Sequence, residues 1–326
     1  MKGHCCCGNS SGNSISGSKN NCKKDFIHIS DYSSEELEKI ISLAEEMKRN
    51  PHQYRESLKG KSLGMIFSKN STRTRISFEV GIFQLGGMGL YFGANDLQLS
   101  RGETVHDTGK VLARYLDGIM IRTFAHNDVT ELAKYASIPV INGLTDYNHP
   151  CQAMADIMTI KEKFGTLKGL KLAYVGDGNN VVRSLAHACI KFGLDVSIVT
   201  PKNYAMEEGF IVSAQQLANS HHKTKVLVTD DIKKGVDGAN VVYTDTFTSM
   251  GQEAERERRL RDLKDYQVND QVMSYANRNA IFMHCLPCHR GEEVTASVID
   301  GPQSAIFDEA ENRLHAQKAI MYMLMK

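Results

Sequence analysis

Short apolar runs alternate with longer amphipathic segments along most of the chain, and this alternation limits the folds that the chain can adopt. Runs such as residues 63–67 have the length of buried strands. The segment that opens at Ser34 instead spaces its apolar residues as a helix does. Strands separated by helices form right-handed βαβ units and parallel sheets. We therefore expect the α/β class, with two open parallel-sheet domains in a chain of 326 residues.

The expected strands fall into two series, with a junction near residues 149–160. The first series comprises residues 63–67, 119–122 and 139–142. The second series comprises residues 170–175, 196–199, 226–228, 239–243 and 280–283. A helix is expected at 76–85, after the first strand. Because ligands bind beyond the carboxyl ends of parallel strands, the polar residues that follow these strands are the candidates for a functional site.

Composition and charge exclude several classes of protein. The net charge of +1 predicts no strong attraction to nucleic acid or to an anionic membrane surface. No apolar run approaches the roughly 20 residues that span a bilayer. The first 25 residues are rich in Gly, Ser, Asn and Cys, which predicts a disordered tail without a secretory signal. We therefore expect a cytoplasmic protein with its eight cysteines as thiols.

Two segments predict ligand contacts, one as an anion site and one as a donor to a carbonyl oxygen. Ser71-Thr72-Arg73-Thr74-Arg75 lies between a strand and a helix, where hydroxyls, free N–H groups and a guanidinium can hold an anion. The alternative is a helix cap with solvated arginines. His149-Pro150-Cys151-Gln152 follows another strand, and Pro150 suits a first helical turn with His149 as the cap. A histidine at that position stays neutral and can donate to a carbonyl oxygen. Its alternative is a capping residue beside an exposed Gln152.

Three further segments have competing interpretations. Gly176-Asp177-Gly178 resembles a dinucleotide turn, but Val181 replaces the third glycine, so a turn that presents Asn180 to a ligand fits better. Asp245, followed by Ser249-Met250-Gly251, suits an ammonium group and a closing loop, or is a simple strand-end cap. Cys285-Leu286-Pro287-Cys288-His289 matches the haem-attachment spacing, yet no export signal accompanies it. A zinc site at His4 to Cys7 would have poor geometry in a disordered tail.

Taken in order, these segments resemble the motifs of the aspartate and ornithine carbamoyltransferases. Ser71-Thr72-Arg73-Thr74, His149-Pro150-x-Gln152 and His284-Cys285-Leu286-Pro287 resemble the carbamoyl phosphate motifs. Asp245-x-x-x-Ser249-Met250-Gly251 looks like the substrate loop of the ornithine branch. The resemblance covers about residues 26–326. It departs at Phe247, where the family usually has tryptophan, and at Cys288, which adds a thiol open to oxidation or thiophilic metals.

The resemblance implies a domain organisation and a set of site residues. It implies a carbamoyl phosphate domain at 26–148, completed by a returning C-terminal helix at 309–326, and an ornithine domain at 149–308. The implied carbamoyl phosphate ligands are Ser71, Thr72, Arg73, Thr74, Gln98 (from a neighbouring subunit of a homotrimer), Arg122, His149, Gln152, Cys285, Leu286 and Arg313. The implied ornithine ligands are Asn180, Asp245, Ser249 and Met250. The implied catalytic residues are Arg122, His149, Cys285 and Asp245.

The implied reaction is the transfer of a carbamoyl group from carbamoyl phosphate to the side-chain amine of ornithine, without a cofactor or metal. The amine attacks directly, so no covalent intermediate with the protein is required. Aspartate as the acceptor would call for cationic residues in place of Asp245. Putrescine lacks the α-carboxylate that the Ser249-Met250-Gly251 loop suits, and an N-acylated ornithine lacks the cation that Asp245 suits. Ornithine is therefore the expected acceptor, with these two amines as the alternatives.

Overall fold

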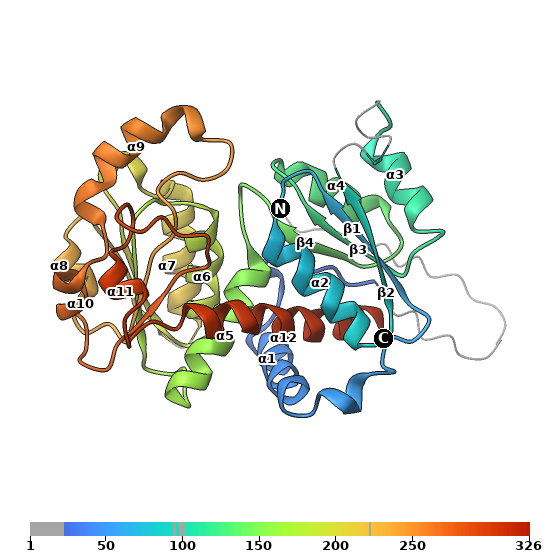
Figure 1. Ribbon diagram of the computed structural model, residues 1–326, viewed down its shortest axis with the longest axis horizontal. Coiled ribbons are helices and arrows are strands. Elements are labelled where there is room, and N and C mark those ends of the chain that lie inside the picture. Colours follow the sequence, from blue (N-terminus) through green and yellow to red (C-terminus); the bar gives the residue numbers. More distant parts are fainter. Residues whose placement is uncertain (1–22, 94–95, 98–101, 222) are drawn as a thin grey trace.

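The computed structural model describes residues 23–93, 96–97, 102–221 and 223–326, which form two lobes built around separate parallel sheets (Figure 1). Residues 1–22 of the expected tail lie outside the described residues, and so does Gln98. The α/β class with two parallel-sheet halves, predicted from the alternation of apolar runs, is confirmed. The exact domain boundaries stay a prediction.

The first sheet has four parallel strands in the order β2-β1-β3-β4. They are β1 (Ser62–Phe67), β2 (Met88–Gly93), β3 (Gly118–Arg122) and β4 (Val140–Leu144). The sequence predicted β1, β3 and β4 but missed β2. That strand lies at the sheet edge, is only partly buried and contains two glycines, so it lacks the continuous apolar run of a central strand. The chain passes outward from β1 to β2 and then back to β3, so the loops after β1 and β3 border a crevice.

The second sheet has five parallel strands in the order β7-β6-β5-β8-β9. They are β5 (Lys171–Val175), β6 (Asp195–Val199), β7 (Val226–Thr229), β8 (Val241–Tyr243) and β9 (Ile281–Met283). All five were predicted. The strand order reverses between β5 and β8, and ligands of such sheets bind at this reversal. Asp177 follows β5 and Asp245 follows β8, so both lie at that point.

Helices cover the two sheets. The helices of the first half are α1 (Ser34–Arg49), α2 (Thr72–Gln84), α3 (Val105–Leu112) and α4 (His126–Tyr135). Those that follow are α5 (Pro150–Phe164), α6 (Asn180–Phe192), α7 (Glu208–Ser220), α8 (Ile232–Val236), α9 (Arg256–Leu263), α10 (Asp270–Ser274), α11 (Ala296–Ile299) and α12 (Ile306–Met325). The chain's first helix starts where expected, because Ser33 and Glu36 form a capping box. In contrast, α2 begins four residues before the expected position 76, since Ser71 caps it.

The last helix joins the two halves. In Figure 1, α12 leaves the lobe of the second sheet and runs to the lobe that holds α1 and α2. It packs against α1, α2 and α5, which confirms the expected return of the C-terminal helix. Its side chains at Ala316, Ala319 and Ile320 are fully buried in the core shared with these helices. Within the part of the chain that the structure describes, no helix combines the length and apolar character needed to cross a membrane.

Candidate active site

A cavity of about 960 Å³ opens between the carboxyl ends of the two sheets. It is lined by loops from both halves and by α12. Apart from Gln98, every residue of the expected site lines this cavity: Ser71, Thr72, Arg73, Thr74, Arg122, His149, Gln152, Asn180, Asp245, Ser249, Met250, Cys285, Leu286 and Arg313. The structure therefore brings together residues that lie up to about 240 positions apart in the sequence.

One wall of the cavity is cationic and centres on the hydroxyl of Thr74. Ser71 caps α2 by accepting a hydrogen bond from the N–H of Thr74 at 3.2 Å. The Thr74 hydroxyl receives Nη1 of Arg122 at 3.3 Å and Nη2 of Arg313 at 3.0 Å. Arg122 and Arg313 are both buried, at 8% and 3% exposure. Two guanidinium groups and a helix N-terminus thus point into one space.

The charges of this wall repel one another. Burial, followed by the neighbouring Arg313 and Arg73, lowers the pKa of Arg122 to about 9. Burial also lowers the pKa of Arg313. Because each group disfavours the charge of the next, a bound anion with more than one negative charge would relieve the repulsion. This wall suits a phosphate group.

His149 occupies the N-cap position of α5, but its side chain does not cap the helix as expected. Its backbone N–H donates instead to the Ser184 hydroxyl at 2.8 Å, and Pro150 fills the first turn. The imidazole is buried and its Nδ1 has no hydrogen-bond partner in the structure. Burial and the nearby cations hold the pKa of His149 well below its usual value. The neutral ring predicted from the sequence is therefore available to a ligand.

Gln152 connects the cationic wall to a buried acidic pair. Its Oε1 accepts from Nη1 of Arg313 at 2.6 Å, while its Nε2 donates to Asp156 at 2.8 Å and to Glu309 at 3.0 Å. Glu309 also accepts from the Tyr243 hydroxyl at 3.1 Å. Burial raises the pKa of Asp156 and of Glu309, and for Glu309 the adjacent Asp156 adds to the rise. Gln152 is thus a buried side chain whose amide is held on both sides by hydrogen bonds. The alternative prediction of an exposed Gln152 is wrong.

The opposite wall carries Asp245 and Cys285. The carboxylate of Asp245 accepts from Nδ2 of Asn179 at 2.7 Å and from the Cys285 thiol at 3.1 Å. Burial and the negative charge of Asp245 raise the pKa of Cys285 well above its usual value, so its sulfur is a protonated donor. Asn180 donates to the Thr145 carbonyl at 2.6 Å and faces the cavity beside them. This wall suits an ammonium group opposite the phosphate wall.

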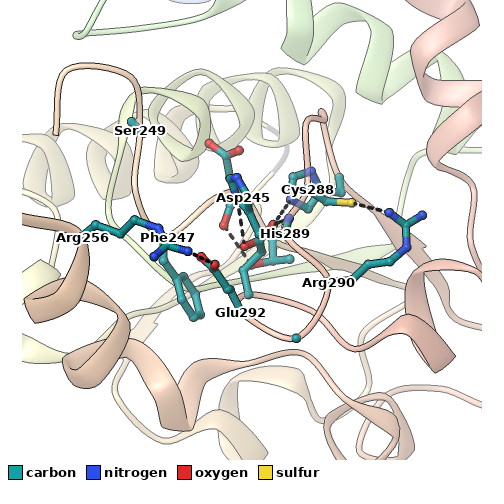
Figure 2. Close-up of polar contacts among 12 residues, drawn as sticks. Asp245, Phe247, Ser249, Arg256, Cys288, His289, Arg290 and Glu292 are labelled. Atoms are coloured by element: carbon teal, nitrogen blue, oxygen red, sulfur yellow. Dashed lines mark hydrogen bonds and ion pairs between the residues drawn. The ribbon is translucent and has the colours of Figure 1, made fainter. Parts of the chain in front are cut away.

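Two loops close the sides of the cavity. Ser249 and Met250 lie on the loop that precedes α9, on which Figure 2 labels Ser249. The N–H of Ser249 donates to Gln252 at 3.1 Å, and Met250 is 44% exposed at the cavity mouth. Leu286 adopts a positive φ of 56°, and the following peptide to Pro287 is cis. The N–H of Leu286 donates to Nδ1 of His284 at 2.9 Å, which fixes the backbone of this turn in the cavity lining.

Comparisons with known proteins match both halves of the chain. Residues 24–162 match "Aspartate/ornithine carbamoyltransferase, carbamoyl-P binding domain", and residues 168–324 match the "Asp/Orn binding domain" of the same family. The chain belongs to the aspartate/ornithine carbamoyltransferase family. It is a carbamoyltransferase, as the sequence predicted.

Individual members of the family support the ornithine branch. The ornithine carbamoyltransferase of Symbiobacterium thermophilum is 56% identical over 304 residues, which cover 93% of this chain and 98% of the relative. That of Bacillus subtilis is 53% identical over 302 residues, covering 93% and 94%. The solved ornithine carbamoyltransferase from Pyrococcus furiosus superposes with a TM-score of 0.90 at 51% identity, covering 93% of this chain and 97% of that one. The resemblance to this branch, first seen in the motifs, is confirmed.

Several residues of the carbamoyltransferase site were missed by the sequence reasoning. Asp177 is paired with Arg259, a buried arginine of α9 whose Nε donates to the Phe247 carbonyl at 2.5 Å. Asp156 and Glu309 lie behind Gln152. Only weak signals marked them: Asp156 follows Gln152 by four residues on one helix, and Glu309 precedes Arg313 by four on another.

The two departures from the family pattern lie in different surroundings. Phe247 is 1% exposed, and its ring faces Gly176, where an added Cβ would lie 3.5 Å from it. It therefore packs beneath the loop rather than at the cavity mouth. Cys288 lies half-buried beside Arg290, whose Nη1 is 3.5 Å from its sulfur (Figure 2). Cys285 and Cys288 are both free thiols.

Proposed function

We propose that this site transfers the carbamoyl group of carbamoyl phosphate to the side-chain amine of L-ornithine, yielding L-citrulline and phosphate in a ternary complex. The observation that carries the proposal is the polarity of the cavity. Buried guanidinium groups of Arg122 and Arg313 form one wall, and the Asp245–Cys285 pair forms the other. A dianionic donor and a cationic acceptor would thereby be held face to face.

The phosphate wall would hold the donor. Phosphate would lie against the N-terminus of α2, with Ser71, Thr72, Arg73 and Thr74 as its ligands and Gln98 reaching it from a neighbouring subunit. Arg122, His149 and Thr74 would donate to the carbonyl oxygen, with Gln152 and Arg313 completing the pocket. As the tetrahedral intermediate forms, these donors stabilise the developing oxyanion. A neutral His149 can donate without protonating that oxygen.

The opposite wall would hold the acceptor. Asn180, Asp245, Ser249 and Met250 would bind the α-amino and α-carboxylate ends of ornithine, and Cys285 and Leu286 would face the carbamoyl nitrogen. The attacking amine must be neutral, so its ammonium form gives a proton to the Asp245–Cys285 pair. Its lone pair then forms the N–C bond, the C–O bond to phosphate breaks, and the second proton lost by the attacking nitrogen leaves with the phosphate as HPO4²⁻. Because Cys285 is a thiol in the free site, Asp245 supplies the oxygen that accepts this proton.

The wider assignments are proposals of the same kind. We place a carbamoyl phosphate domain at 26–148 with 309–326, and an ornithine domain at 149–308. We propose a cytoplasmic homotrimer, in which Gln98 completes the site of the next subunit. No cofactor, nucleic acid or membrane enters the proposed reaction.

An acceptor panel tests the proposed function. Colorimetric detection of the carbamoylated product is measured with carbamoyl phosphate and either ornithine, putrescine, N-acetylornithine or aspartate. We expect ornithine to give the highest kcat/KM by a wide margin. Asp245→Asn should remove most of this preference, because the carboxylate that suits the α-ammonium is lost. Equal or better rates with putrescine or N-acetylornithine would assign the site to another amine, and the absence of any product would overturn the proposal.

A further inference from the structure

Three potential metal ligands gather on the segment that follows the Cys285–Pro287 turn. They are His289, Glu292 and Glu293, and one ligand atom from each lies within 4.8 Å of the other two. Figure 2 shows His289 and Glu292 below Asp245, with the side chain of Arg256 reaching Glu292. His289 lines the mouth of the active-site cavity, whereas neither glutamate has a role in the proposed reaction.

Glu293 gives this cluster a buried oxygen without a partner. The residue is 0% exposed, and its Oε1 accepts from Nε2 of His284 at 3.2 Å and from the N–H of His289 at 2.5 Å. Its Oε2 is buried without a hydrogen-bond partner, and Nδ1 of His289 lies 3.8 Å away. A buried carboxylate oxygen left unpaired is unfavourable unless a donor or a cation satisfies it. The second oxygen of Glu293 therefore points to a ligand between it and His289.

The geometry and ligand types fit a divalent transition metal. Ligand atoms bound to a tetrahedral zinc at about 2.0–2.1 Å lie roughly 3.3 Å apart, so the His289–Glu293 separation of 3.8 Å, and separations within 4.8 Å across the cluster, require the side chains to close on the ion. The His289 side chain is 48% exposed and can supply that movement while giving an ion access. Two carboxylates and one imidazole suit zinc, cobalt or manganese.

A cation at this position would compete with a guanidinium. Glu292 forms an ion pair with Nη2 of Arg256, the first residue of α9. Arg256 is half-exposed, so it can leave without stranding a buried charge. We propose that His289, Glu292 and Glu293 form a divalent transition-metal site at the cavity rim, in which the metal and Arg256 compete for Glu292. This site is separate from the proposed reaction and does not depend on which amine is the acceptor.

Cobalt titration of the full chain tests the site, because Co²⁺ reports both affinity and ligand type. Binding is followed by equilibrium dialysis and by visible and near-ultraviolet absorption. We expect bound Co²⁺ with d–d absorption and without a thiolate charge-transfer band. His289→Gln and Glu292→Gln should each weaken binding about tenfold or more. Arg256→Gln should tighten it, since the competitor for Glu292 is removed. The matched control His52→Gln alters an exposed histidine elsewhere and should change nothing.

A second cluster, formed by Asp245, His284 and Cys285, gives the experiment its counter-outcome. Cobalt held there would show a thiolate charge-transfer band that Cys285→Ser abolishes, and that result would overturn the proposal. Unchanged affinity in both His289→Gln and Glu292→Gln would also overturn it, as would weaker binding in Arg256→Gln. His289 and Glu292 are reached from the surface, so their variants should fold, and the far-ultraviolet circular dichroism of each variant verifies this. A folded Glu293→Gln variant should bind cobalt more weakly. If Arg256→Gln still tightens cobalt binding in that variant, the result supports the assignment.

Discussion

The guanidinium of Arg313, in the last helix, lies 3.0 Å from the hydroxyl of Thr74, which stands 239 residues earlier in the second helix. Arg122 reaches the same oxygen from β3 at 3.3 Å. One hydroxyl thus fixes two cationic side chains that come from a sheet and from the helix joining the two halves. The cationic wall depends on this shared hydroxyl, because its two hydrogen bonds hold the guanidinium groups of Arg122 and Arg313 next to each other.

Thr74→Val should reduce catalysis without unfolding the protein. Valine keeps the shape of threonine but removes the oxygen that orients both guanidinium groups and donates toward the substrate carbonyl. We expect kcat/KM to fall about 10²–10³-fold, the range for losing one oxyanion donor. Steady-state kinetics with both substrates measures the effect. Thr130→Val, which removes a hydroxyl that donates to the Asn127 carbonyl of α4 away from the cavity, is the control, and comparable losses in both variants would contradict the assigned role.

The buried pair Asp156 and Glu309 should make a contribution to stability that is lost as pH rises from about 4 toward neutrality. Their raised pKa values mean that the folded chain keeps protons that the unfolded chain releases in this window. The contribution of the pair to the free energy of unfolding therefore decreases with pH, by about 1.4 kcal/mol per pH unit for each proton retained. Urea unfolding at a series of pH values measures the slope.

Asp156→Asn should remove part of this decrease relative to the unmodified protein, since Glu309 then titrates without the neighbouring carboxyl group. Asp308→Asn, which alters an exposed acid next to Glu309 in the sequence, should leave the slope in place. A slope that is the same in Asp156→Asn and in the unmodified protein would show that the buried pair does not cause it.

Cys285→Ala should lower the rate and alter its pH profile. The thiol donates to Asp245 at 3.1 Å, so its loss changes the group proposed to take a proton from the attacking ammonium. We expect the acidic limb of the kcat profile to shift and kcat to fall about 10–100-fold. The matched control is Cys288→Ala, which removes the neighbouring thiol outside this contact. If Cys285→Ala leaves both the rate and the pH profile unchanged, Cys285 has no part in proton transfer.

Arg259→Gln should weaken the ornithine side of the site selectively. Arg259 is buried, pairs with Asp177 and holds the Phe247 carbonyl at the base of the substrate loop. Loss of a charged hydrogen bond of about 1.5–3 kcal/mol corresponds to a rise in the KM for ornithine of roughly 10–100-fold. The KM for carbamoyl phosphate should change little. Arg258→Gln alters the exposed neighbour and serves as the control; equal effects on both KM values would argue against a local role.

The sequence by itself determined the fold class, all but one of the described strands and the positions of the site loops. Eight of the nine strands in the described part of the chain are recognisable because buried parallel strands are continuous apolar runs, whereas the edge strand Met88–Gly93 carries no such pattern. Thr74, His149, Asp245 and Cys285 were found because each directly follows a strand or opens a helix, which are local and readable features.

Tertiary structure alone decided which side chains support that site. Asp156 and Glu309 meet behind Gln152 only because α12 crosses from one half to the other and packs on α5. Arg259 reaches Asp177 across 82 residues, and the unpaired oxygen of Glu293 arises from burial beneath His284. These contacts depend on packing between distant segments and on the loss of water, which leave no spacing or composition pattern in the chain.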